Sequence, residues 1–236
     1  MVELAEHKSA KAMRILTVTR ELLLKRGFRG ITVAQIAERA HVGKGTVYLY
    51  WDTKEDLFAE LVTRDFLSAV DDYIAVLEGD PEQIRPHRLL PRLIRTGLEY
   101  PLVRAIQAGD VDTLGLLAEH PSSRQWLAVL GPEALLTAVL PVWRAHGLVR
   151  QDWELDAQAY LVRALMDGFF GLAANTTAAP AVGVEKPDEV LAATVREVLE
   201  VADPTTAGIA AAARETLRLM VKSRDIAAAS LSSARN

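Results

Sequence analysis

The chain has 236 residues, half of them hydrophobic, and a formal net charge of −4. This composition excludes global disorder and allows either one large domain or a small domain beside a larger one. The absence of cysteine excludes a disulfide framework, thiolate catalysis and cysteine-ligated zinc. Because no apolar run reaches the roughly 18 residues of a membrane span, and the N-terminus lacks a signal-peptide core, we expect a cytoplasmic protein without a membrane partner.

The charges are unevenly distributed along the chain. Residues 1–60 carry ten Lys and Arg against eight Asp and Glu, whereas the remainder carries 17 against 23. A mildly basic first segment on an acidic remainder is compatible with DNA binding by the first segment.

The first predicted helix covers about residues 9–25. Gly27 follows it at the position of a left-handed C-cap, which favours glycine because glycine has no Cβ to clash. The residues that form one stripe at helical spacing are Ala12, Ile15, Leu16, Thr19, Leu22 and Leu23.

The start of the second helix is marked by a predicted capping box, because Thr32 and Gln35 have the required spacing. Ile31 and Ile36 flank them at the positions of a hydrophobic staple. We therefore expect a short helix over about residues 33–40.

A second short helix, over residues 44–50, is predicted after the tight turn His41-Val42-Gly43. Thr53 then caps a long helix over residues 54–77, with two acidic residues in its first turn to complement the helix dipole.

The remainder is helical in pattern almost throughout. Pro91 and Pro141 fall inside two predicted segments, so a kink or a shifted boundary is expected there. Residues 173–186 are predicted to form a loop and residues 229–236 a disordered tail. Helices are predicted at about 86–100, 101–108, 110–118, 122–130, 132–146, 155–173, 187–201 and 205–228.

Two short helices joined by a three-residue turn and flanked by supporting helices form a helix-turn-helix. The second of them enters the DNA major groove and presents its N-terminal residues to base edges. Val47 and Trp51 are four residues apart and are predicted to face the core. The residues left for DNA are Thr32, Lys44, Gly45, Thr46, Tyr48, Leu49 and Lys54.

The side chains of these predicted DNA-contacting residues can bind phosphates or base edges. Lys44 can donate to a phosphate or a guanine, and Thr46 offers a hydroxyl and a methyl to a base edge. Tyr48 can donate its hydroxyl to a phosphate. Thr32 and Lys54 stand at helix starts, where free N–H groups and the helix dipole favour a phosphate.

The stretch TVAQIAERAHVGKGTVYLYWDTKEDLFAELV resembles the DNA-binding head of the TetR family of bacterial regulators, over about residues 10–62. His41 stands where family members commonly have Gly, and Gly43 where they have Ser. Both keep the turn, because His tolerates the left-handed region and Gly is a workable N-cap. Leu49, often polar or aromatic in relatives, leaves the DNA role of its position open.

The resemblance implies an all-α fold with two domains. Residues 1–56 would form a three-helix DNA-binding domain, and residues 57–228 a larger helical domain for effector binding and dimerisation. We predict a ligand-responsive transcriptional regulator that binds a near-palindromic double-stranded DNA operator as a homodimer. The first hypothesis is a repressor that a small apolar or amphipathic effector releases from the operator.

The larger domain offers candidate residues for both roles. The predicted effector pocket comprises Phe66, Gly97, Tyr100, Leu116, Trp126, Leu136, Trp143, Met166 and Phe170, which supply apolar bulk with a few polar tips. The predicted dimer interface comprises Tyr160, Leu161, Ala164, Leu165, Gly168, Phe169, Ala212 and Leu219, in a four-helix bundle that pairs residues 155–173 with residues 207–221.

Several alternatives stay open. A transcriptional activator or an effector-independent regulator of the same fold has the same sequence features. An all-helical enzyme or carrier is a different class, but there is no G-x-S-x-G elbow and no histidine pair at metal spacing. We therefore predict no catalytic residue, no metal site and no cofactor. A protein-interaction module that uses the helix-turn-helix as a scaffold is a third class.

Overall fold

The structure is a computed structural model that describes residues 10–108, 110, 132–174 and 184–233. Across these residues the chain is helical, apart from loops and one isolated antiparallel bridge between Val149 and Glu200. The all-α fold class is thereby confirmed. In the described part of the chain, no helix is both long and apolar enough to cross a membrane.

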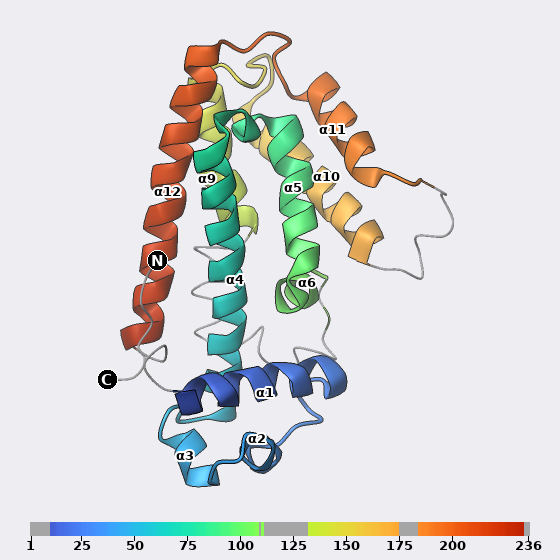
Figure 1. The fold of residues 1–236 in the computed structure, drawn as a ribbon. Helices are drawn as coiled ribbons and strands as arrows, with labels where there is room; N and C mark the ends of the chain where they lie inside the picture. Colours follow the sequence, from blue (N-terminus) through green and yellow to red (C-terminus); the bar gives the residue numbers. More distant parts are fainter. Residues whose placement is uncertain (1–9, 109, 111–131, 175–183, 234–236) are drawn as a thin grey trace.

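Three helices form one end of the molecule, which we call the head: α1 (Ala10–Arg26), α2 (Val33–Arg39) and α3 (Lys44–Tyr48) (Figure 1). Gly27 ends α1 with φ 65°, and its N–H donates to the Leu23 carbonyl at 2.9 Å. The left-handed cap that the sequence predicts is therefore present. The predicted stripe of α1 is buried at every position: Ala12, Ile15, Leu16, Thr19, Leu22 and Leu23.

Helix α4 (Lys54–Gly79) runs from the head into the rest of the molecule, which we call the body (Figure 1). It begins with a capping box, in which Asp56 N–H donates to Thr53 Oγ1 at 3.0 Å and Thr53 N–H donates to Asp56 Oδ2 at 3.1 Å. One uninterrupted helix therefore belongs to both parts.

Within the described residues, the body comprises one 3-10 helix and six α-helices. The predicted bounds lie within a few residues of the observed ones, and Pro91 and Pro141 lie inside helices without ending them. The predicted helices at 110–118 and 122–130 lie outside the described residues. The elements are η2 (Pro81–Ile84), α5 (Pro86–Glu99), α6 (Pro101–Gln107), α9 (Pro132–Ala145), α10 (Leu155–Ala174), α11 (Pro187–Val198) and α12 (Thr206–Ser233).

The predicted disordered tail is wrong for residues 229–233, because α12 continues to Ser233. Alanine has the highest helix propensity, and the run Ala227-Ala228-Ala229 carries the helix onward. Ala227 and Ala228 are also buried against the head, which fixes this end of the helix by tertiary contact.

Two clusters of buried apolar side chains divide α4 between them. The head cluster contains the first half of α4, through Leu67, together with α1 to α3, part of α6 and the end of α12. The body cluster starts at Tyr73 and adds α5, α9, α10, α11 and the rest of α12. Val70 packs against both clusters. The predicted division of the chain between residues 56 and 57 stays a prediction.

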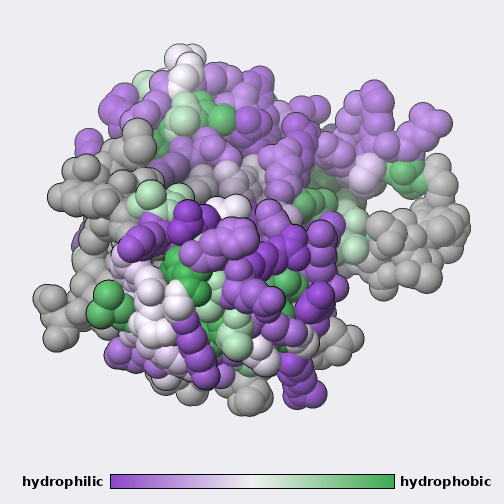
Figure 2. All heavy atoms as spheres, turned by 60° about the horizontal axis from the view of Figure 1, so that its bottom comes forward, coloured by the Kyte–Doolittle hydropathy of each residue, from purple (hydrophilic) through white to green (hydrophobic). Residues whose placement is uncertain are grey.

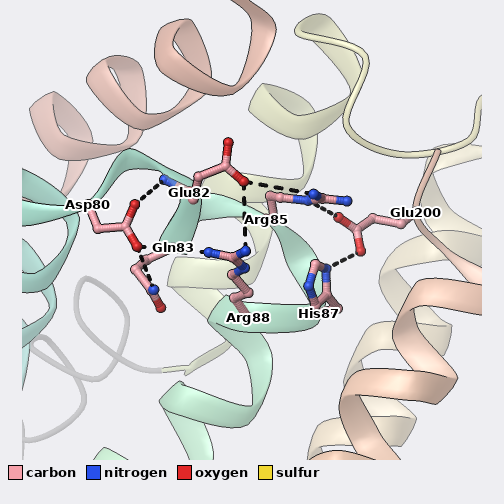
Figure 3. Close-up of polar contacts among 7 residues, drawn as sticks. All are labelled: Asp80, Glu82, Gln83, Arg85, His87, Arg88 and Glu200. Atoms are coloured by element: carbon pink, nitrogen blue, oxygen red, sulfur yellow. Dashed lines mark hydrogen bonds and ion pairs between the residues drawn. The ribbon is translucent and has the colours of Figure 1, made fainter. Parts of the chain in front are cut away.

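A cluster of polar side chains joins the start of α5 to Glu200, which follows α11 (Figure 3). The buried carboxylate of Glu200 accepts a bond from Arg85 Nε at 2.9 Å and contacts His87 Nδ1. Trp143, which is fully buried, donates its indole N–H to the Ile84 carbonyl at 2.8 Å. These contacts join segments that lie far apart in the sequence.

Candidate nucleic-acid interface

The start of α2 sets the geometry of the helix-turn-helix. Thr32 N–H donates to Gln35 Oε1 at 2.9 Å, and Gln35 N–H donates to Thr32 Oγ1 at 3.3 Å, so the predicted capping box is formed. Ile31 and Ile36 are both buried, as a hydrophobic staple requires. The helix start is therefore fixed by residues within a few positions of one another.

The turn between α2 and α3 carries both departures from the family pattern. His41 adopts φ 52°, in the left-handed region that the turn requires. Gly43 is the N-cap of α3 and makes no side-chain cap bond. Helix α3 ends at Tyr48 rather than at the predicted Tyr50, because its last turn tightens: Tyr50 N–H donates to the Val47 carbonyl at 3.0 Å.

The inner side of α3 is anchored in the head cluster by Val47 and Trp51, as predicted. Trp51 also donates its indole N–H to Glu60 Oε2 at 2.6 Å, and Glu60 Oε1 accepts from Arg64 Nε at 3.0 Å. Sequence reasoning missed this buried contact, because nothing in the residue types couples Trp51 to a carboxylate nine positions away. The contact ties the segment after α3 to α4.

The outer side of α3 is open to solvent. Lys44, Gly45, Tyr48 and Leu49 are exposed and Thr46 is half-buried, while Lys44 Nζ lies 5.7 Å from the centroid of the Tyr48 ring. Thr32 is exposed at the start of α2. The fold thus places six of the seven predicted DNA residues on accessible surface of α2 and α3.

Lys54 has a role in the fold that the sequence did not predict. Its ammonium donates to the Phe28 carbonyl at 2.6 Å and lies 4.0 Å from the centroid of the Phe28 ring. Burial lowers the pKa of this lysine, and Glu55 raises it by less. The side chain therefore fastens the start of α4 to the segment after α1, and its contact with DNA stays a prediction.

Exposed cations surround the helix-turn-helix. Arg39 pairs with Glu21 at 3.1 Å, which orients α2 against α1. In Figure 2, the head is turned toward the viewer, and hydrophilic residues dominate the surface with a few isolated hydrophobic ones between them. The exposed Lys and Arg of α1 and its following turn are Lys11, Arg14, Lys25, Arg26 and Arg29.

A cavity of about 80 Å³ lies in the body between α4, α5, α6, α9, α10 and α12. Its wall is mainly apolar, and the polar side chains in it are those of Tyr73, Gln107 and Ser223. The Tyr73 hydroxyl is already used, because it donates to the Leu93 carbonyl at 3.0 Å. Five of the predicted pocket residues line this cavity: Phe66, Gly97, Leu136, Met166 and Phe170.

The other predicted pocket residues lie elsewhere. Trp143 is part of the body cluster and its polar tip bonds to Ile84, so it does not reach the cavity. Tyr100 donates its hydroxyl to Asp72 Oδ2 at 2.6 Å, and burial together with that carboxylate raises its pKa to about 12. Leu116 and Trp126 lie outside the described residues.

The predicted dimer interface is only partly at the surface. Tyr160 is 78% exposed, and Ala164 and Gly168 are exposed one and two turns further along α10. Ala212 is wrong as an interface residue, because it is fully buried in the body cluster. Leu219 lines the cavity.

Three further predicted interface residues of α10, namely Leu161, Leu165 and Phe169, are half-buried. Helix α10 packs on α5, α9 and α11, whereas α12 packs on α4, α9 and η2.

Comparison with known proteins finds similarity concentrated in the head. Residues 15–61 match the family described as bacterial regulatory proteins, tetR family. The chain is 42% identical over 62 residues to an uncharacterized HTH-type transcriptional regulator, YdeS, of Bacillus subtilis, covering 26% of this chain and 29% of that protein. It is 29% identical over 133 residues to the HTH-type transcriptional repressor KstR of Mycolicibacterium smegmatis, covering 51% and 65%. The matches span less than two thirds of the length of either relative.

The likeness in three dimensions extends further along the chain. The crystal structure of a tetR family transcription regulator from Shewanella sp. PV-4 superposes with a TM-score of 0.55. The superposition covers 81% of this chain and 99% of that one, at 18% sequence identity. At this identity the likeness concerns the fold alone, which places a helical body behind the head in both proteins.

Proposed function

The chain belongs to the TetR family of bacterial regulatory proteins, and we propose that it regulates transcription by binding double-stranded DNA through the outer side of α3. The observation that carries this proposal is the division of α3 into two sides. Val47 and Trp51 hold its inner side in the core, while the side chains of Lys44, Tyr48 and Leu49 are exposed on its outer side. A rigidly anchored helix with exposed polar and cationic groups suits the major groove.

The proposed DNA-binding unit is a homodimer on a near-palindromic operator. Two recognition helices related by a two-fold axis reach successive major grooves when they lie about 34–36 Å apart. The exposed side of α10, with Tyr160, Ala164 and Gly168 in register, supports pairing through this helix, because small residues allow two helices to approach closely. Sedimentation of wild type and Gly168→Arg would test it, and a monomeric wild type would contradict it.

The proposed regulation is a population shift driven by a small apolar or amphipathic effector in the body cavity. The cavity is lined by side chains of six helices, so an effector that widens it moves at least one of them. Helix α4 supplies wall residues Phe66 and Tyr73 and also enters the head. A ligand that binds the widened cavity more tightly therefore favours a different orientation of the heads. The name of the relative KstR, a repressor, supports repression as the sign of regulation.

The DNA-binding proposal is tested by titrating the protein against labelled duplexes that tile the DNA flanking its own gene, at several salt concentrations. Tight binding to one near-palindromic segment is expected, with a slope of log affinity against log salt near 0.9 per phosphate contact. Lys44→Ala should reduce that slope by about 1.8, since it removes one phosphate contact from each of the two recognition helices of the dimer. Arg196→Ala, an exposed cation on α11 in the body, is the matched control and should change nothing.

Three outcomes are informative. Binding without sequence preference would indicate that the operator lies outside the tested DNA. Selection from genomic fragments would then locate it. Absence of salt-dependent DNA binding by the folded protein would contradict the proposal. An equal effect of Lys44→Ala and Arg196→Ala would contradict the assignment to α3.

The cavity is tested with an uncharged fluorescent probe, N-phenyl-1-naphthylamine. In Gly97→Ala the new Cβ would lie 2.7 Å from Gln107 Oε1 and 3.2 Å from Phe170 Cε2, so the wall must shift or the cavity shrink. We expect weaker probe binding than in wild type. Gly79→Ala adds the same methyl at the end of α4, where nothing lies within 4 Å, and serves as the control. Equal binding by both variants would place the probe outside this cavity.

A further inference from the structure

Leu49 is the most exposed large hydrophobic residue in the described part of the chain, at 81%. It lies on the outer side of α3, next to Tyr48, which is 43% exposed. A single exposed leucine on a surface needs no explanation by itself. This one, however, stands among the residues that the proposed function directs at DNA, and its position is fixed by the helix.

The backbone of Leu49 is helical and fixes where the side chain can reach. Leu49 is the C-cap residue of α3 with φ −70° and ψ −25°, and its N–H donates to the Gly45 carbonyl at 3.0 Å. Side chains of a helix lean toward its N-terminus and cover the surface over the preceding turn. A side chain at this position is directed along the outer side of α3, toward the N-terminal half of the helix.

Gly45 leaves this part of α3 uncovered. It is exposed, and a Cβ at its position would meet nothing within 4 Å. With no side chain at Gly45, the backbone of α3 can come close to the floor of a groove. In a helix that approaches DNA this closely, the exposed isobutyl group of Leu49 would come within reach of base edges.

The chemistry of the side chain restricts its partner on DNA. Leucine neither donates nor accepts a hydrogen bond, so it cannot bind a phosphate or the polar edge of a base. In the major groove the apolar group on a base edge is the C5 methyl of thymine. On the same surface Lys44 and Tyr48 end in polar groups and Thr46 offers one methyl beside its hydroxyl, so Leu49 supplies the largest wholly apolar side chain.

We propose that Leu49 packs against the C5 methyl of one thymine in each half-site and thereby selects thymine over cytosine at that position. The inference rests on the proposed function, because it names the base that one residue of the DNA-binding surface reads. It adds a specificity-determining residue at the position whose role the sequence left open.

The experiment replaces each thymine of the operator, one at a time in both half-sites, by deoxyuridine, which differs only in lacking the methyl. Wild type should lose affinity about fourfold per half-site at one symmetric position, the value expected for one buried carbon. Leu49→Ala should bind the unmodified operator more weakly and lose no further affinity at that position. Leu49→Met, which keeps an apolar side chain of similar length, should restore part of the sensitivity.

The controls separate this inference from its premise. Thr46→Ala should keep the deoxyuridine effect that Leu49→Ala abolishes, and equal thermal unfolding of the variants shows that the head stays folded. Equal deoxyuridine sensitivity of wild type and Leu49→Ala would overturn the role of Leu49 while leaving DNA binding intact. A changed oligomeric state of Leu49→Ala would overturn it as well, by assigning Leu49 to a protein contact. Absence of any salt-dependent DNA binding by wild type would overturn the proposed function and this inference together.

Discussion

The longest-range polar contacts of the body span far more of the sequence than those of the head, whose helix starts are fixed by local contacts. In the head, the capping boxes of α2 and α4 each join residues three positions apart. In the body, Arg85 bonds to Glu200 across 115 positions, and Arg224 bonds to Asp71 across 153. Local contacts form wherever the short motif occurs, whereas the distant ones depend on how the helices pack. A family signature can therefore be concentrated in the head while the body diverges around the same fold.

The comparison between head and body can be tested by substitutions, and the largest loss in the free energy of unfolding is expected at Trp143. Trp143→Ala should lower the free energy of unfolding by about 3–5 kcal/mol, because it removes a fully buried indole from the body cluster. Trp143→Phe keeps most of the volume and loses only the bond to Ile84, so about 1–2 kcal/mol is expected. Urea unfolding followed by far-UV circular dichroism measures both.

Urea unfolding of Trp143→Ala also tests whether the head and the body unfold independently. Since α4 passes through both core clusters, DNA binding and helicity should be lost at the same urea concentration. DNA binding that persists beyond the loss of body helicity would show that the head unfolds by itself.

The next effect concerns the distant polar contacts of the body. Glu200→Gln removes a buried carboxylate that serves both Arg85 and His87, and should cost about 2 kcal/mol in the free energy of unfolding. Glu215→Gln is the matched control, because Glu215 pairs with His146 at 2.7 Å on an exposed surface, where such pairs contribute about 0–1 kcal/mol. Similar losses in the free energy of unfolding of the two variants would contradict a larger contribution of the buried ion pairs.

A smaller effect is expected for the local contacts of the head. Thr32→Ala removes the cap of α2 and should cost about 1 kcal/mol in the free energy of unfolding. Thr17→Ala serves as control, because the Thr17 hydroxyl only donates to the Met13 carbonyl on the exposed side of α1. A loss in Thr17→Ala as large as that in Thr32→Ala would argue against a capping contribution.

The smallest effect is a dependence of stability on pH at His87. Burial lowers the pKa of this histidine below its ordinary value of 6.5, by more than Glu200 raises it, and Arg196 and Arg85 lower it further. The unfolded chain therefore binds a proton that the folded chain excludes, so the free energy of unfolding falls as the pH drops below about 6.5.

His87→Asn keeps a donor near the Nδ1 position without a titrating group. Thermal unfolding between pH 7.5 and 5.5 should therefore show a weaker pH dependence in this variant than in wild type. An identical pH dependence in the two proteins would assign the effect to other groups.

Five of the nine predicted pocket residues line the cavity, and the two described residues that do not line it, Tyr100 and Trp143, have a physical explanation. Phe66, Gly97 and Phe170 line the cavity as predicted, whereas Trp143 lies in the core beside it. Apolar residues on the inner side of a helix share one pattern whether they meet a neighbouring helix or an empty space. Ala212 shows the same limit, since a small residue suits a dimer contact and an internal helix crossing equally well.

The sequence by itself determined the helix-turn-helix, down to the capping box of Thr32 and Gln35, the left-handed His41 and the buried Val47 and Trp51. These features depend on residues within a few positions, where spacing fixes geometry. Only the tertiary structure decided that Lys54 turns back onto Phe28 and that Glu60 accepts from Trp51. Such contacts depend on which helix surfaces meet, and that is set by the packing of the whole chain rather than by any segment of it.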